Sequence, residues 1–193
     1  MVEQNHPFAE LVLGTIIHVT GVEGYRGIRK DRLIRPNLGD LKPTWASNVP
    51  VYYYCQKRAA VSVLDLKHAD RSSLFKRASH GVNFQNWLGV FTYHTPSIAL
   101  CLNLGAREQN LFRCSSTEEL LEDGTKHIFE AEACFPDPIP YAFISNIIVV
   151  EGSIDKFRNT RKTELTDCDL HELERSSKEF QKSDSFYDEG LSL

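Results

Sequence analysis

Two glutamates, Glu130 and Glu132, lie two positions apart in a segment that alternates like a β-strand. In residues 127–135 they share a face with Ile128 and Cys134, and the residues between them are apolar. Paired carboxylates can hold a hydroxyl group, accept its proton or stabilise a developing positive charge. The pattern therefore predicts acid–base or charge-stabilising chemistry on this face, and a solvent-facing edge strand is the alternative that stays open.

A histidine and a threonine share one face of an earlier predicted strand. Residues 15–20 are rich in β-branched side chains, and alternation places Ile16, His18 and Thr20 together. A histidine in this place is either a ligand-binding group or a satisfied core side chain, and the sequence leaves both interpretations open.

Aromatic and basic residues supply further candidates. Tyr52, Tyr53 and Tyr54 are consecutive in a β-rich run, so one or two of them would face any site there. Residues 26–35 hold five bases and the single acid Asp31. This stretch is either a solvated helix face or an anion site.

The elements that must position these residues predict one mixed α+β domain. The fold class is α+β, with mixed or antiparallel sheets and few short helices, because strands do not alternate regularly with long helical patterns. We expect strands at residues 15–20, 51–55, 59–66, 87–93, 97–103, 127–135 and 144–150, and helices at 22–30 and 116–124.

The predicted domain covers residues 1–152, and residues 153–193 are predicted to be a polar, acidic appendage. From residue 151 onward the chain has eleven acids and seven bases, out of 26 and 22 in all, which leaves residues 1–150 with no net charge. We expect a helix at 169–180 and a disordered end. A neutral body gives no global electrostatic argument for nucleic-acid binding.

Composition narrows the class of protein. The chain has 193 residues, 41% of them hydrophobic, and no apolar run of roughly 18 residues that could span a membrane. Residues 1–10 hold two acids and no Lys or Arg, unlike a secretory signal. Five cysteines, never closer than 13 positions, indicate neither a disulfide framework nor a zinc site, so we predict reduced thiols in a cytoplasm.

Familiar catalytic motifs are absent from the sequence. It contains no GxxxxGK[ST] loop, no GxGxxG, no GxSxG and no HExxH. Kinase, Rossmann dehydrogenase, α/β-hydrolase and zincin interpretations are therefore disfavoured.

Three stretches of the chain together resemble the ADP-ribosyltransferase fold. These are His18-Val19-Thr20 with the following helix and Leu33-Ile34, the aromatic run after Pro50, and residues 129–150. DarT-type toxins, which modify DNA, are the nearest named relatives by this motif. Two positions depart from the pattern: Arg32 stands where a glycine is usual, and the second-strand Ser-Thr-Ser or Tyr of several subfamilies has no unambiguous counterpart.

The resemblance implies that NAD is the substrate and that no metal is needed. The nicotinamide–ribose bond of NAD breaks through a positively charged, oxocarbenium-like state, which a fixed carboxylate stabilises. Glu132 would be that catalytic group, and Glu130 would hold the acceptor.

The resemblance also assigns binding roles to residues before the carboxylates. His18 would bond a ribose or the nicotinamide amide, with Thr20 supporting it. A tyrosine would stack on the nicotinamide ring, and an arginine would pair with the pyrophosphate. The candidates for these last two roles are Tyr52, Tyr53, Tyr54, Arg29 and Arg58.

The predicted function is transfer of ADP-ribose from NAD to a macromolecule, DNA or protein, by a toxin or defence effector in a cytoplasm. An inhibitor or antitoxin protein would be a further partner, and no membrane is involved. The alternative is a catalytically inactive module of the same fold that binds a nucleotide or a partner. NAD-dependent removal of a phosphate from RNA fits the carboxylate pair less well.

Overall fold

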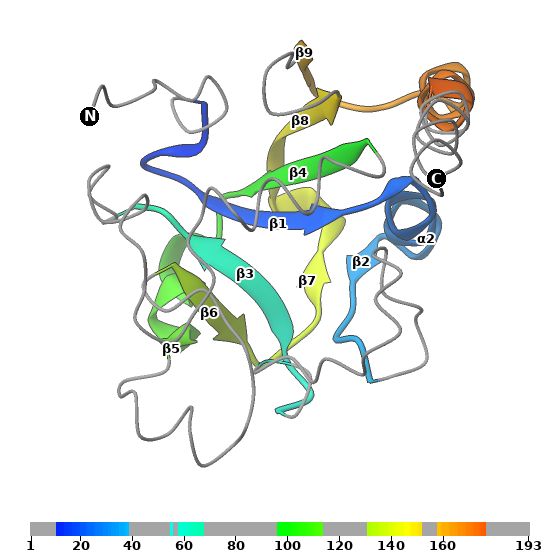
Figure 1. The fold of residues 1–193 in the computed structure, drawn as a ribbon. Coiled ribbons are helices and arrows are strands. Elements are labelled where there is room, and N and C mark those ends of the chain that lie inside the picture. The colour runs from blue at the N-terminus through cyan, green and yellow to red at the C-terminus, as the bar shows by residue number, and fades with distance from the viewer. Residues whose placement is uncertain are drawn as a thin grey trace, which may run out of the picture.

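The computed structural model describes residues 11–38, 55, 58–67, 96–113, 131–151 and 158–176, and they form a mixed α+β structure, as predicted (Figure 1). Within these residues, one sheet has seven strands in the order β5-β6-β3-β1-β4-β8-β9, and every neighbouring pair is antiparallel. Its strands are β1 (Ile16–Thr20), β3 (Val61–Asp65), β4 (Ser97–Leu102), β5 (Phe112–Arg113), β6 (Glu132–Phe135), β8 (Ile144–Glu151) and β9 (Arg158–Lys162).

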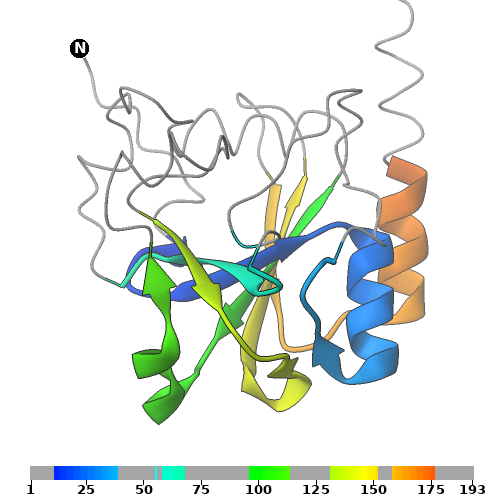
Figure 2. The same cartoon turned by 90° about the horizontal axis from the view of Figure 1, so that it is seen from below.

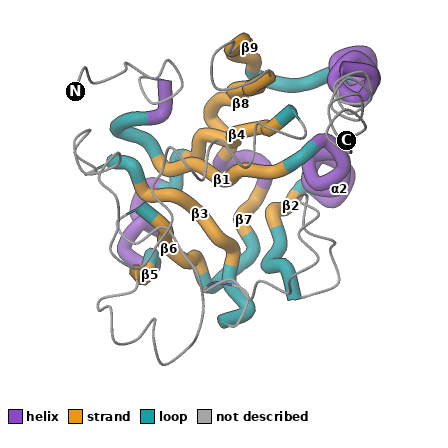
Figure 3. The backbone as a smooth tube through the Cα atoms, in the orientation of Figure 1, coloured by secondary structure: helices purple, strands orange, loops and turns teal. Residues whose placement is uncertain are grey.

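A smaller sheet and short helices complete the described structure. The second sheet pairs β2 (Leu33–Ile34) with β7 (Ile139–Pro140). The longer helical elements are α2 (Val22–Asp31), the 3₁₀ helices at Gly105–Asn110 and Tyr141–Phe143, and a helix at 167–176, and residues 11–12 and Cys55 are helical as well (Figure 3). The predicted helix at 116–124 and the predicted strand at 87–93 lie outside the described residues.

Both faces of the large sheet are covered by apolar residues. On one face, Ile16 and Leu100 pack with Tyr25 and Ile28 of α2. On the other face, Ile17 packs in a separate cluster with members such as Leu64, Leu66, Ala99 and Ile148. Two covered faces explain why residues 147–150 of β8 are buried without a break and read as a continuous apolar run.

Residues 158–176 pack on the core, which corrects the described part of the appendage predicted at 153–193. β9 pairs with β8, and Leu165, Leu170 and Leu173 are buried in the cluster that contains Ile16. The helix at 167–176 lies beside α2 in both views (Figure 2). The segment is helical in part, as predicted. Its overall composition is polar, but three leucines suffice to pack it against the core.

The residue that follows α2 has a left-handed backbone conformation. Arg32 has a φ of 57°, in the left-handed region that costs L-residues about 1–2 kcal/mol. Its guanidinium lies 3.9 Å from the centre of the Tyr141 ring, and its carbonyl accepts a 2.9 Å hydrogen bond from the Tyr141 N–H. These contacts hold Arg32 in a conformation that suits glycine better.

A disulfide joins Cys55 to Cys134, so the prediction of five reduced thiols is wrong. The two Cα atoms lie 5.3 Å apart although 79 positions separate the residues. The spacing of the cysteines along the chain did not reveal this pair, because the pairing depends on which segments become neighbours in the fold. Cys101 and Cys168 are not disulfide-bonded, and Cys114 lies outside the described residues.

The prediction of a cytoplasm was based on reduced thiols, and the disulfide removes that basis. Cys55 itself lies in a helical turn, so the predicted strand at 51–55 does not include it. Among the described helices, none is long and apolar enough to cross a bilayer.

Candidate functional site

The candidate site lies where β1 and β3 part from each other. The two strands pair through Ile16↔Asp65 and Ile17↔Leu64. Beyond this point the described residues of β1 continue pairing with β4 only, and those of β3 continue with β6 only. The large sheet therefore forks immediately before His18.

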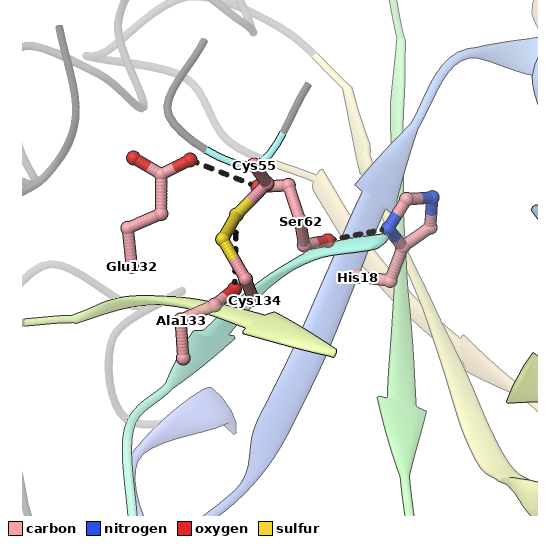
Figure 4. Close-up of a disulfide and its surroundings, with 6 residues drawn as sticks. All are labelled: His18, Cys55, Ser62, Glu132, Ala133 and Cys134. Atoms are coloured by element: carbon pink, nitrogen blue, oxygen red, sulfur yellow. Dashed lines mark hydrogen bonds between the residues drawn. A yellow bond between two sulfur atoms is a disulfide. The ribbon is translucent and has the colours of Figure 1, made fainter. Parts of the chain in front are cut away.

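His18 is fixed at this fork by the backbone of β3. Its Nδ1 lies 2.8 Å from the carbonyl oxygen of Ser62 (Figure 4). Because a carbonyl only accepts, Nδ1 must carry the proton, and Nε2 of the neutral ring is left as an acceptor. Burial lowers the pKa of His18 below its usual 6.5, and the bond to Ser62 opposes this in part. A half-buried, neutral imidazole suits a hydroxyl donor.

Glu132 is held by the side chain of the same serine. The Ser62 hydroxyl donates a 3.0 Å hydrogen bond to Oε1 of Glu132. Glu132 is only 6% exposed and lies on β6 between β5 and β3, which excludes the solvent-facing edge strand. A buried carboxylate beside a fixed donor can stabilise positive charge in a bound ligand.

His18 and Glu132 nevertheless start from opposite faces of the sheet. His18 pairs with Leu100, whose side chain lies in the same cluster as Ile16. Glu132 pairs with Leu64, which belongs to the cluster on the other face. Ser62 joins the two, since its carbonyl bonds His18 and its hydroxyl bonds Glu132. A site that used both residues would have to reach across the fork.

Thr20 is turned toward α2. It pairs with Ile98 on the α2 side of the sheet, and a Cβ at Gly24 would come closer to its Oγ1 than atoms can approach. A side chain at Gly24 would therefore force the Thr20 hydroxyl to move, which favours glycine here although it costs about 1 kcal/mol relative to alanine inside a helix.

Arg29 bonds the C-terminal segment and is not brought to Ser62 or Glu132. Its guanidinium donates to the Leu165 carbonyl at 2.9 Å and to Asp167. Nearby, Arg26 pairs with Glu174. Three of the five bases at 26–35 are thus ion-paired, Arg35 with Asp31 at 3.0 Å, which favours the interpretation as a surface face over that of an anion site.

Of the remaining predicted site residues, Arg58 is among those that the structure describes and the others are not. Arg58 is half-buried in the turn that leads into β3, where its N–H donates to the Cys55 carbonyl at 3.2 Å. Outside the described residues lie Glu130, Tyr52, Tyr53 and Tyr54. Within the described part of the chain, no group of three or more His, Cys, Asp and Glu residues is placed to hold a metal ion.

Sequence reasoning missed Ser62, the residue that links the two sides of the fork. Its signal is weak but present: in residues 59–66, Ser62 and Asp65 are the two polar positions in an otherwise apolar strand. Cys134 was placed correctly on the Glu132 face, but its partner Cys55 was not recognised.

The chain matches no family model, and it has no significant match among curated proteins or solved structures.

Proposed function

We propose that this chain is an NAD-dependent ADP-ribosyltransferase that acts on a macromolecule, DNA or protein, as a toxin or defence effector. The observation that carries the proposal is the buried carboxylate of Glu132, held by Ser62 beside the fork where His18 is also bonded to Ser62. The α+β architecture with antiparallel sheets is in keeping with an ADP-ribosyltransferase fold.

In the proposed reaction, the bond between nicotinamide and the ribose C1′ breaks, and the electron pair leaves with nicotinamide. The carboxylate of Glu132 stabilises the positive charge that develops on the ribose. A nucleophile of the acceptor then forms a bond to C1′ and gives up its proton to a base. Ser62 keeps the carboxylate oriented, and Nε2 of His18, on the other side of the fork, accepts a hydrogen bond from a hydroxyl of the adenosine-side ribose.

Ser62 also provides a candidate for a position that the resemblance left open. Several subfamilies carry a serine or tyrosine on the second strand, and Ser62 lies on the strand between those of His18 and Glu132. Likewise, the left-handed backbone of Arg32 is where a glycine would be expected. We take both positions as support for the proposal.

The variant Glu132→Gln tests the proposal. It keeps the size of the side chain and a hydrogen-bonding oxygen, but it removes the negative charge. We expect release of labelled nicotinamide to fall by roughly 10²–10³-fold, while NAD affinity changes little. The matched control is Glu172→Gln on the exposed side of the helix at 167–176. Undiminished release in Glu132→Gln would remove the mechanism.

A second candidate is a catalytically inactive module that binds a nucleotide or a partner. The observation that favours it is that His18 and Glu132 project from opposite faces of the sheet. Incubation of the chain with labelled NAD and a mixture of protein, DNA and RNA separates the two functions. Nicotinamide release supports the transferase, whereas NAD binding without release supports the module.

A further inference from the structure

The Cys55–Cys134 disulfide lies directly beside the Ser62–Glu132 hydrogen bond (Figure 4). Cys134 is two residues beyond Glu132 on β6, on the same face, and it is the direct partner of Ser62 in the β3–β6 ladder. Cys55 belongs to the turn that leads into β3, where its carbonyl accepts hydrogen bonds from Arg58 and Ala60. The covalent bond thus connects β6 to the turn that leads into β3, and these two strands supply the hydrogen bond.

The disulfide adds a covalent constraint to a short strand. β6 has four residues, all buried, and its neighbour on the far side, β5, has only two. A shift of β6 by one residue along β3 would turn Glu132 to the other face. The ladder with β3 and the buried side chains oppose such a shift, and the disulfide opposes it further by holding Cys134 in place.

The sulfur atoms are shielded from solvent in the folded chain. Cys55 is 1% exposed and Cys134 is not exposed, and they pack with Ala60 and Phe112. A thiol in solution must reach a sulfur atom to exchange with it, so the folded protein should keep the redox state in which it folded. Cys55 Sγ lies 3.4 Å from the Ala133 carbonyl oxygen, which would accept a hydrogen bond from a reduced Cys55 thiol.

We propose that the redox conditions during folding set the activity of the Glu132 site, a proposal that rests on the proposed function. During folding, a thiolate of Cys55 or Cys134 attacks a small-molecule disulfide and releases one small thiol, and the other cysteine then attacks the resulting mixed disulfide and displaces the second small thiol. Two protein thiols are oxidised, and the small disulfide is reduced to two thiols. Chain folded in this way holds Glu132 on Ser62, and chain folded in a reducing medium holds it less firmly.

The test refolds the full chain in oxidised glutathione or in a reducing dithiol and compares the two products. Alkylation and mass spectrometry should find Cys55 and Cys134 blocked from reaction in the oxidised product until it is both unfolded and reduced. We expect the reduced product and the Cys55→Ser/Cys134→Ser variant to release nicotinamide on the order of tenfold more slowly, with similar NAD affinity. The matched control Cys168→Ser removes an exposed free thiol and should change nothing.

Amide hydrogen exchange of residues 61–65 and 132–135 provides a measurement that needs no activity. Faster exchange there in the reduced product supports the proposal, and equal exchange in both products overturns it. Equal nicotinamide release by both products also overturns it. Release by neither product would refute the proposed function instead, and hydrogen exchange would then decide alone whether the disulfide fixes β6.

Discussion

Ser62 shows how a single residue can serve two neighbours with different groups. Its carbonyl belongs to the strand backbone and fixes the tautomer of His18, and its hydroxyl orients the buried carboxylate of Glu132. The sequence pointed to His18 and Glu132 because their types carry chemistry. It did not point to Ser62, because the role of a serine depends on which strands become its neighbours.

The lowered pKa of His18 predicts a loss of stability in mild acid. The unfolded chain takes up a proton near pH 6.5, whereas the folded chain resists protonation because the ring is buried. The contribution of the neutral His18 ring to stability should therefore be fully present above about pH 6.5. It should be lost as the pH falls toward the lower pKa of the folded state. Urea unfolding of the wild type and His18→Gln across this range measures the effect, which should be weaker in the variant.

The exposed His171 provides the matched control for this pH dependence. Its side chain is 74% exposed, so His171→Gln should keep the wild-type dependence. An unchanged pH dependence in His18→Gln would show that the imidazole of His18 is not the group responsible.

Arg32 allows a comparison of two substitutions at one backbone conformation. Because φ is 57° there, the free energy of unfolding of Arg32→Gly should exceed that of Arg32→Ala by about 1 kcal/mol. Arg32→Gly should therefore unfold at a higher urea concentration. Both variants lose the contact with the Tyr141 ring, so this loss cancels in the comparison. Equal stability of the two variants would mean that the left-handed conformation is not retained in solution.

At the scale of elements, the sequence predicted strands better than it predicted their neighbours. Apolar, β-branched runs gave β1, β3, β4 and β8 nearly at their observed bounds. The fork between β1 and β3 could not be predicted, because alternation defines the faces of a strand but not where its ladder ends. β9 was missed since its sequence, Arg-Asn-Thr-Arg-Lys, is polar throughout.

The helix at 167–176 begins with a reciprocal pair of hydrogen bonds. The Thr166 hydroxyl oxygen accepts from the Asp169 N–H at 3.2 Å, and the Asp169 carboxylate accepts from the Thr166 N–H at 2.8 Å. Lys162 also pairs with this carboxylate. This pairing is the largest of the causes that lower the pKa of Asp169 to about 2, and the hydrogen bonds from Thr166 act in the same direction. This arrangement is a capping box with Asp in the place of Glu.

Asp169→Asn should therefore destabilise the chain by about 1 kcal/mol at neutral pH. In the wild type this contribution is present above the unfolded pKa of about 3.9 and is lost as the pH falls toward 2. Thermal unfolding at neutral pH and near pH 2 should show the difference between wild type and variant shrinking in acid. A constant difference would indicate that the carboxylate charge does not stabilise the helix start.

At the scale of the whole molecule, Tyr25 ties three parts of the chain together. It is fully buried on α2, its hydroxyl accepts from the Leu165 N–H at 3.2 Å, and it lies 3.0 Å from the Tyr141 hydroxyl. Contacts of this kind join segments more than 100 positions apart and leave no trace in local periodicity. They are the reason that a polar C-terminal segment was interpreted as separate from the domain.

Leu170→Ala tests whether the C-terminal segment is part of the core. Leu170 is completely buried with Ile16 and Tyr25, and loss of a buried leucine side chain typically costs 2–5 kcal/mol. The variant should therefore unfold cooperatively at a clearly lower urea concentration than the wild type. Glu172→Ala, on the exposed side of the same helix, should change stability by less than about 0.5 kcal/mol. A solvated appendage would make both substitutions equally mild, so a silent Leu170→Ala would contradict the packing of this segment against α2.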